Sequence, residues 1–162
     1  IALRFAQAGA QVQVADLAAA AGRETVALIT AAGGQAEFSA LDVADEAAAR
    51  SLAEKLNTRH GALDILVNNA GIGHVGTILQ TSGEDLDRLY RVNVRGVFNV
   101  TKAFLPAMLA KKRGSVIALA SIGGVLAVRD RFAYVTTKFA VVGMTKQLTL
   151  DHAADGVRFN CI

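Results

Sequence analysis

Apolar residues recur along the chain with two alternating periods, one typical of strands and one typical of helices. Short β-branched or alternating runs predict strands at 11–16, 36–43, 63–68, 115–120 and 157–161. Longer segments with helical spacing lie around them, at 1–8, 18–32, 45–60, 82–112 and 132–152. Strands that alternate with helices throughout favour an α/β fold: a doubly wound, Rossmann-type parallel sheet with helices on both faces.

The polar residues at the helix ends support these boundaries. Asp45 is the expected N-cap of the helix at 45–60, and Ser82 with Asp85 forms a candidate capping box for the next one. That next helix is long, and we expect a break near Gly96 and a kink at Pro106.

The chain opens inside a helical pattern, with no strand before it. In a doubly wound sheet of order 3-2-1-4-5-6 the first strand is central, so the strands at 11–16 and 63–68 would have nothing between them. We therefore expect residues 1–162 to be one partial domain that lacks its first strand and a C-terminal part. The alternative is a complete three-layer fold of unusual strand order.

Composition narrows the class of protein. The chain has 162 residues, of which 52% are hydrophobic, yet no apolar run approaches the length of a membrane span. The net charge of +3 is small and its Lys and Arg residues are scattered, unlike a nucleic-acid footprint. A single cysteine, Cys161, excludes an internal disulfide. We expect a soluble, cytoplasmic protein that binds neither nucleic acid nor membrane.

A glycine-rich stretch after the third predicted strand, Gly71-Ile-Gly73-His-Val-Gly76, matches a dinucleotide-binding pattern. That pattern works only when a helix begins at its last glycine and points at the pyrophosphate. Here the next helix start is Ser82, so we interpret the match as accidental.

Asp16 ends the first predicted strand. An acidic side chain there could accept hydrogen bonds from both ribose hydroxyls of an adenosine, or it could simply form a turn. The glycine loop that normally precedes such an acid by about 20 residues would fall just before Ile1.

The stretch Tyr134-Val-Thr-Thr-Lys138 places a phenol and an ammonium on one face of a helix. A positive charge about 4 Å away contributes about 4 kcal/mol at an effective dielectric constant of 20, before desolvation. That would lower the pKa of a phenol by up to about three units and make it a usable acid–base. Ser121, at the end of a predicted strand, could hold the same substrate oxygen. The alternative is a solvated helix face and a serine in a turn.

Further residues turn this pattern into a specific one. In order and spacing the chain resembles the short-chain dehydrogenase/reductase family, through Asn68-Asn69-Ala70-Gly71, Asn93, Ser121, Tyr134, Lys138, Leu41-Asp42-Val43 and the ending Val157-Arg-Phe-Asn160. The resemblance covers essentially the whole chain and implies an NAD(P)-binding domain of the Rossmann type.

The resemblance also implies catalytic roles. Tyr134 would be the general acid–base, and Ser121 would orient and polarise the substrate oxygen. Lys138 would lower the tyrosine pKa and hold the nicotinamide ribose, while Asn93 would maintain a water in the proton relay.

For the cofactor, the resemblance implies that Asp42 and Val43 lie at the adenine and that Asn69, Ala70 and Gly71 line the dinucleotide. Asp16 stands where a carboxylate would repel a 2′-phosphate, which favours NAD over NADP. The family's glycine loop and substrate lid are absent from these residues, so we expect the 162-residue chain alone to be inactive, neither folding cooperatively nor binding NAD.

Arg131 lies three residues before Tyr134 and could pair with a substrate carboxylate. The stretch around it resembles a branch that acts on hydroxy acids, including 3-hydroxybutyrate-type and 2-keto-3-deoxy-sugar-acid dehydrogenases. The alternative is that Arg131 pairs with Asp130 or faces solvent.

Three functions remain open at this level. The leading one is an NAD-dependent alcohol/ketone oxidoreductase, and the others are an NADPH-dependent 3-oxoacyl reductase and a non-catalytic dinucleotide sensor. The three histidines show no metal-ligand spacing, so we expect no metal site. The helices at about 83–112 and 132–152 would join copies into a dimer or tetramer, as they do in the family.

Overall fold

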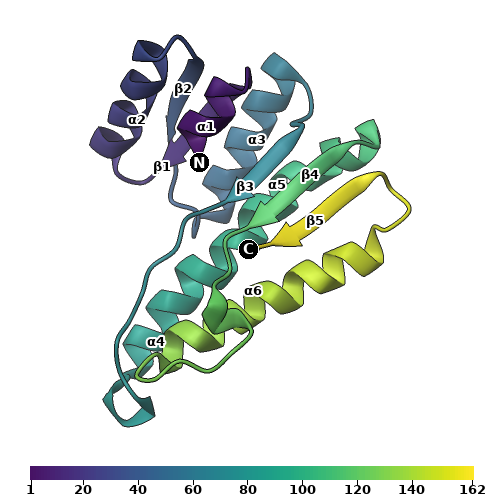
Figure 1. Ribbon diagram of the computed structural model, residues 1–162. Coiled ribbons are helices and arrows are strands. Elements are labelled where there is room, and N and C mark those ends of the chain that lie inside the picture. The colour runs from purple at the N-terminus through teal and green to yellow at the C-terminus, as the bar shows by residue number, and fades with distance from the viewer. The chain divides into compact units, whose positions relative to one another are not determined.

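The computed structural model describes all residues 1–162, which divide into two compact units, 1–42 and 43–162 (Figure 1). Both units are built from parallel strands and helices, as the sequence predicts. The strands form two separate sheets, ordered β1-β2 in the first unit and β3-β4-β5 in the second.

The first unit contains one parallel strand pair and two helices. Its elements are α1 (Ala2–Gln7), β1 (Gln11–Asp16), α2 (Ala19–Ala31) and β2 (Gln35–Ala40). Gln11 stands opposite Gln35, and the register continues to Asp16 opposite Ala40. Gly22 of α2 lies against the Phe38 ring, which would collide with any larger side chain at position 22.

The second unit holds a three-stranded parallel sheet with β4 in the centre. Its helices are α3 (Glu46–His60), α4 (Gly83–Tyr90), a π-helical turn η2 (Arg91–Arg95), α5 (Gly96–Lys111) and α6 (Phe132–Asp151). Its strands are β3 (Ile65–Asn68), β4 (Gly114–Ala118) and β5 (Val157–Cys161), and the 3₁₀ turns η1 (Ile78–Gln80) and η3 (Ile122–Gly124) lie in the connections.

Most predicted boundaries are confirmed to within two residues. The two N-caps are confirmed as well: the Asp45 carboxylate accepts a hydrogen bond from the Ala48 N–H at 2.9 Å, and Ser82 Oγ accepts one from the Asp85 N–H at 3.0 Å. The predicted break near Gly96 is the π-helical turn that ends there.

Two strand predictions were too long. The strand predicted to reach residue 43 ends at Ala40, and the one predicted to reach 120 ends at Ala118. In the second case the apolar run continues, but the chain leaves the sheet after the Leu119 N–H has bonded to the Asn68 carbonyl. Hydrophobicity alone does not mark that exit.

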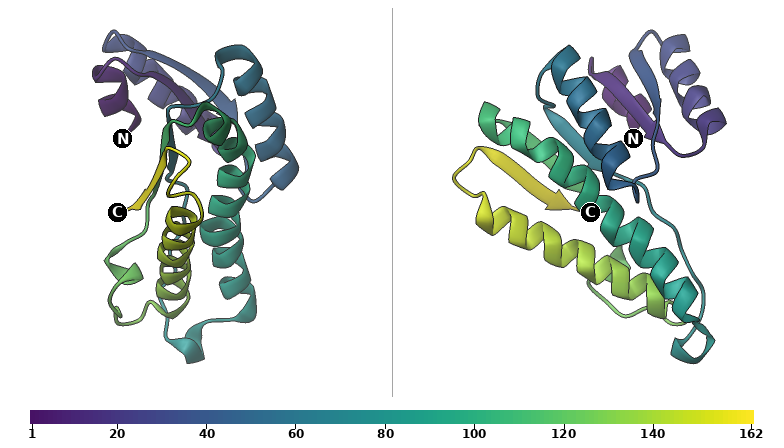
Figure 2. Two further views of the ribbon diagram at one scale, coloured as in Figure 1. Left: turned by 90° about the vertical axis from the view of Figure 1, so that its right-hand side faces the viewer. Right: turned by 180° about the vertical axis from the view of Figure 1, so that it is seen from behind.

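The core of the second unit joins the central strand to two helices. Val97 of α5, Ala118 of β4 and Val141 of α6 form one buried cluster, and Cys161 packs against it from β5. Figure 2 shows α5 and α6 running side by side along this sheet. This packing fixes the start of α6 relative to the carboxyl end of β4. None of the helices combines the length and the apolar character that crossing a membrane requires.

Candidate active site

Ser121 lies just beyond the carboxyl end of β4, where open parallel sheets place their ligands. The Leu119 N–H donates to the Asn68 carbonyl at 2.9 Å before the chain turns into η3. Ser121 caps this turn, because its Oγ accepts a hydrogen bond from the Gly123 N–H at 3.1 Å. The serine is therefore held by the turn that follows it.

Tyr134 lies in the first turn of α6 and is half-buried. A Cβ built on Gly123 would lie 3.6 Å from Ser121 Oγ and 3.6 Å from Tyr134 Cε1. The hydroxyl of the serine and the ring of the tyrosine thus flank one glycine. The Tyr134 backbone carbonyl accepts a hydrogen bond from Thr137 Oγ1, whereas the phenol hydroxyl forms no hydrogen bond with another residue.

Lys138 brings a cation to the same place. Its Nζ lies 5.6 Å from the centroid of the Tyr134 ring and donates a hydrogen bond to the Leu119 carbonyl at 2.6 Å. The residue is only 6% exposed. Burial lowers the pKa of the Lys138 ammonium below its usual value of 10.5, and attraction to the charged form of Tyr134 opposes that shift.

Asn93 lies in the π-helical turn η2 and is 1% exposed. Its Oδ1 accepts a hydrogen bond from the Ile72 N–H at 2.8 Å, and its Nδ2 donates to the Ile72 carbonyl at 2.9 Å and to Thr137 Oγ1 at 3.0 Å. Thr137 in turn donates to the Tyr134 carbonyl at 2.8 Å. One buried amide therefore ties the loop after β3 to the helix that carries the tyrosine.

These bonds use both N–H groups of the Asn93 side chain. The Asn93 side chain therefore has no N–H left to donate to a water.

Sequence reasoning missed Thr137, which is fully buried between Asn93 and Tyr134. The only available signal was its place inside the stretch Tyr134 to Lys138, three residues after the tyrosine. It also missed the Leu119 carbonyl that holds the lysine.

The loop after β3 presents backbone rather than side chains to this site. A Cβ built on Gly71 would lie 3.4 Å from Asn93 Oδ1 and 3.6 Å from Lys138 Nζ. Asn69, Ala70 and Gly71 are exposed, whereas Asn68 is buried and donates to Thr101 Oγ1 at 2.9 Å. Asn68 thus anchors the strand end from which the exposed loop starts.

The remaining predicted cofactor residues lie in different surroundings. In the first unit, Asp16 is exposed and its Oδ1 accepts from the Ala18 N–H at 2.8 Å, the turn-forming role that the sequence left open. Asp42 closes that unit and is half-buried. In the second unit, Val43 packs against Gly96, and its carbonyl accepts from Asn99 Nδ2 at 3.0 Å.

The accidental glycine pattern does not open a helix. The Gly76 N–H donates to the Asp130 carbonyl at 2.8 Å, and the Phe132 N–H donates to the Gly76 carbonyl at 3.1 Å. This bridge joins the loop after β3 to the loop before α6, and α4 begins only at Gly83. This bridge makes residues 71–76 a wall beside the start of α6, not a phosphate loop.

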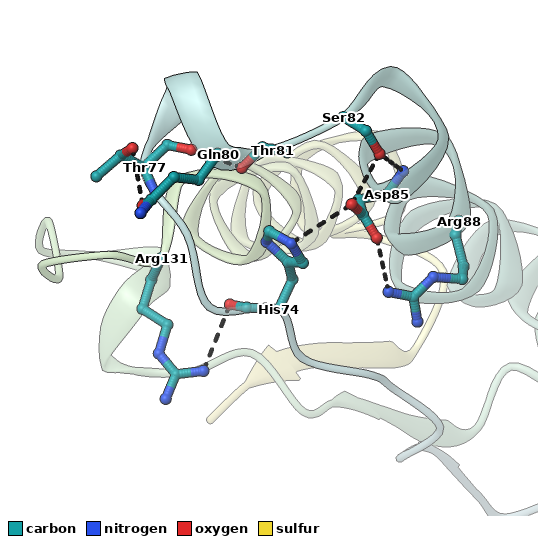
Figure 3. Close-up of polar contacts among 8 residues, drawn as sticks. All are labelled: His74, Thr77, Gln80, Thr81, Ser82, Asp85, Arg88 and Arg131. Carbon is teal, nitrogen blue, oxygen red and sulfur yellow. Dashed lines mark hydrogen bonds and ion pairs between the residues drawn. The ribbon is translucent and has the colours of Figure 1, made fainter.

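Arg131 extends along this wall, as Figure 3 shows. Its Nη1 donates to the His74 carbonyl at 3.4 Å, and no carboxylate lies within ion-pair distance of it. Arg131 is not paired with Asp130, and it is half-buried. Its positive charge is not neutralised by the chain.

His74 connects the same wall to α4, which sequence reasoning did not foresee (Figure 3). Its Nε2 lies 3.6 Å from Asp85 Oδ2, and Asp85 is also bonded to Ser82 at 2.7 Å and to Arg88 at 3.1 Å. The Ser82 hydroxyl first and the Arg88 guanidinium second hold the pKa of Asp85 below its usual 3.8. This charged cluster fixes the outer end of the loop.

Comparison with known proteins places this arrangement in context. A family model described as short chain dehydrogenase matches residues 1–162. An uncharacterized oxidoreductase of Thermotoga maritima is 38% identical over 161 residues, which are 99% of this chain and 63% of the relative. Oxidoreductase UcpA of Escherichia coli is 41% identical over 122 residues, 75% of this chain and 46% of the relative.

A solved structure agrees at the level of the fold. The crystal structure of a gluconate 5-dehydrogenase from Burkholderia cenocepacia, in complex with NADP and tartrate, superposes with a TM-score of 0.92 at 34% identity. The match covers 99% of this chain and 63% of that one. The chain thus spans less than two thirds of the length of these relatives. It has their Rossmann-like α/β fold, and it belongs to the short-chain dehydrogenase family.

Proposed function

We propose that the protein is an NAD(P)-dependent oxidoreductase that interconverts a secondary alcohol and a ketone. The observation that carries this proposal is the meeting of three side chains: Ser121 Oγ and the Tyr134 ring flank Gly123, and Lys138 Nζ lies 5.6 Å from the ring centroid. We propose further that both units belong to a single dinucleotide-binding domain, since the solved relative matches the chain from end to end.

Oxidation of an alcohol removes a hydride from carbon and a proton from oxygen. The nicotinamide cofactor, when bound, accepts the hydride. Tyr134 takes the proton from the substrate hydroxyl, and the nearby Lys138 ammonium favours the phenolate that does so. Ser121 donates a hydrogen bond to the substrate oxygen and holds it beside the phenol. In the reverse direction Tyr134 returns the proton to the ketone oxygen.

The residues present fit a bound dinucleotide. Gly71 leaves open the space next to Lys138 Nζ, where a larger side chain would intrude. Lys138 would hold the nicotinamide ribose, and the exposed backbone of residues 69–71 would line the cofactor. Asn93 and Thr137 would hold this loop in a fixed position relative to Tyr134 through their buried hydrogen bonds.

Cofactor choice rests on Asp16 and Asp42 of the first unit, proposed at the ribose and the adenine. A carboxylate at position 16 would repel a 2′-phosphate and favour NAD, although the similar gluconate 5-dehydrogenase holds NADP. The ratio of kcat/KM for NAD to that for NADP tests this, and it should fall in Asp16→Ser. An unchanged ratio would exclude Asp16 as the selecting group.

For the substrate we propose a hydroxy acid. Arg131 carries an unneutralised guanidinium three residues before Tyr134, suited to a carboxylate. The gluconate 5-dehydrogenase structure, which contains tartrate, supports this class. Arg131→Met should raise KM for hydroxy acids and leave neutral alcohols unaffected, while the exposed Arg129→Met serves as the matched control.

Tyr134→Phe tests the central proposal, with Tyr90→Phe as its control, since Tyr90 is the only other tyrosine and is 50% exposed. We expect Tyr134→Phe to lose turnover by a factor of about 10²–10⁴ while retaining dinucleotide binding. Turnover that survives would instead favour a non-catalytic dinucleotide sensor.

We also propose that copies of the protein associate through α4, α5 and α6. Tyr90, Phe98 and Phe139 leave large apolar side chains 43–50% exposed on these helices. Introducing a charge with Phe98→Glu should shift the assembly toward monomers in sedimentation experiments.

A further inference from the structure

A cavity away from the serine and tyrosine lies between α3 and α5. Its volume is about 270 Å³, larger than a single water requires and close to that of small-ligand pockets. Figure 1 shows α3 and α5 side by side in the second unit. Both walls of this groove are helical, and its polar groups can be assigned to donors and acceptors.

Asn99 of α5 supplies an acceptor without a partner. The residue is 1% exposed, and its Nδ2 donates to the Val43 carbonyl at 3.0 Å. That bond fixes the orientation of the amide, because only the nitrogen of the two amide atoms can donate to a carbonyl. Asn99 Oδ1 therefore stays buried with no hydrogen-bond donor.

Asn57 on the opposite helix adds a second amide oxygen. Its Oδ1 is also buried without a donor, and the residue lines the same groove. Two unpartnered amide oxygens on facing helices are unusual, since buried polar atoms are nearly always hydrogen-bonded. An N–H or O–H group placed in the groove could donate to both oxygens.

A third acceptor is the backbone carbonyl of Lys102, which Pro106 leaves without a helical donor. Proline has no N–H, so the Lys102 carbonyl one turn earlier lacks its regular helical donor. Both residues line the groove. The residues that line the groove thus include three with a carbonyl-type oxygen that lacks its usual donor: Asn57, Asn99 and Lys102.

The charged side chains around the groove leave one carboxylate available. The Lys102 ammonium is occupied by Glu46, at 2.8 Å across the two helices. Arg50 and Glu54 stand four residues apart on α3 but form no ion pair with each other. Glu54 is the carboxylate at the rim that no ion pair within the chain occupies.

We propose that this groove binds the guanidinium group of a small organic molecule. A guanidinium presents five N–H donors in one plane and accepts no hydrogen bonds, which matches the two amide oxygens of Asn57 and Asn99. Its donors would satisfy Asn57 Oδ1 and Asn99 Oδ1, and its charge would face Glu54. The proposal uses none of the residues assigned to the oxidoreductase reaction, so either can fail without the other.

The test titrates the purified protein with three probes at millimolar concentration and follows the side-chain amide signals of Asn57 and Asn99 by NMR. Methylguanidinium carries both charge and N–H donors, N-methylurea carries donors only, and tetramethylammonium carries charge only. We expect saturable shifts with methylguanidinium, binding weaker by a factor of about ten with N-methylurea, and no saturable shift with tetramethylammonium.

Two variants and a control locate the site. Asn57→Leu removes one acceptor and should weaken methylguanidinium binding about tenfold, whereas Asn57→Asp adds a negative charge and should strengthen it. Thr58→Val, an exposed neighbour outside the groove, should leave the affinity unchanged.

Should Asn57→Leu fail to fold, the aspartate variant and the probe series still decide the outcome. Equal shifts from all three probes, or none from methylguanidinium, would mean that the groove holds water only and would overturn the proposal.

Discussion

Lys138 Nζ donates a hydrogen bond to the Leu119 carbonyl over 2.6 Å, which joins α6 to the loop that leads from β4 to Ser121. The same ammonium lies 5.6 Å from the Tyr134 ring centroid. We propose that this one buried cation positions the serine loop and favours the phenolate of Tyr134. Its two roles can be separated experimentally, because one affects stability and the other affects turnover.

Lys138→Met should lower kcat by a factor of about 10²–10⁴, since it removes the charge that favours the phenolate. Its effect on stability should depend on pH. Burial lowers the pKa of Lys138 below 10.5, so the folded protein loses this proton before the unfolded chain does. The free energy of unfolding of the wild type should then rise with pH between the folded-state pKa of Lys138 and 10.5. Above 10.5 the lysine is neutral in both states, so the cost of burying its charge no longer changes with pH.

Denaturant unfolding of both proteins from neutral to alkaline pH checks this expectation. The stability of Lys138→Met relative to the wild type should be greatest near neutral pH and should decrease as pH 10.5 is approached. A difference that stays constant over this range would mean that the lysine is not desolvated.

Thr137→Val should destabilise the fold through Asn93. The substitution keeps the shape of a fully buried side chain but removes the oxygen that accepts from Asn93 Nδ2. An unsatisfied buried donor costs about 1–3 kcal/mol, which equilibrium unfolding would measure. Thr136→Val is the matched control: its exposed hydroxyl bonds only to the Phe132 carbonyl within the helix, so we expect a change below about 0.5 kcal/mol.

The catalytic candidates were predictable because their spacing follows local geometry. Tyr134 and Lys138 share a helix face in any regular helix, and Ser121 follows an apolar strand. Thr137 was not predictable, since its importance depends on the π-helical turn that aims Asn93 at it. No sequence pattern identified that turn beyond an expected break near Gly96.

The same distinction applies to the rest of the molecule. Strand and helix order followed from periodicity, and the N-caps Asp45 and Ser82 followed from side-chain chemistry. The pairing of α3 with α5, which leaves Asn57 and Asn99 without donors, is a tertiary contact between residues 42 positions apart in the numbering. Such unsatisfied groups appear only once the helices are packed.

Replacing Gly124 of η3 and Gly143 of α6 by alanine should change the stability of the protein in opposite directions. A Cβ at Gly124 would lie 2.9 Å from both the Lys138 carbonyl oxygen and Val142 Cγ2. Gly124→Ala should therefore push η3 away from α6, destabilise the protein by about 1–3 kcal/mol and reduce turnover. Gly143, in the middle of α6, has no atom within 4 Å of such a Cβ.

Gly143→Ala should consequently stabilise the protein by about 0.5–1 kcal/mol, because alanine favours a helix interior. Thermal unfolding and steady-state kinetics of the pair measure both effects. Similar stability changes of one sign in both variants would contradict the close approach of η3 to α6.

Stability at acid pH should depend on the cluster around Asp85. The Ser82 hydroxyl, followed by Arg88, holds the pKa of Asp85 below 3.8 in the folded protein. A carboxyl with a lowered folded-state pKa contributes stability at pH values above 3.8, and that contribution disappears as the pH falls through the folded-state value. Ser82→Ala removes the principal cause, so the Asp85 pKa should rise toward 3.8 in an NMR titration of its carboxyl carbon. The free energy of unfolding of Ser82→Ala should therefore depend less on pH below 3.8 than that of the wild type. Thr81→Ala is the control, because the Thr81 hydroxyl bonds only to the Thr77 carbonyl. This control should keep the full pH dependence. If the two variants titrate alike, the hydroxyl of Ser82 is not what holds the carboxylate in its charged form.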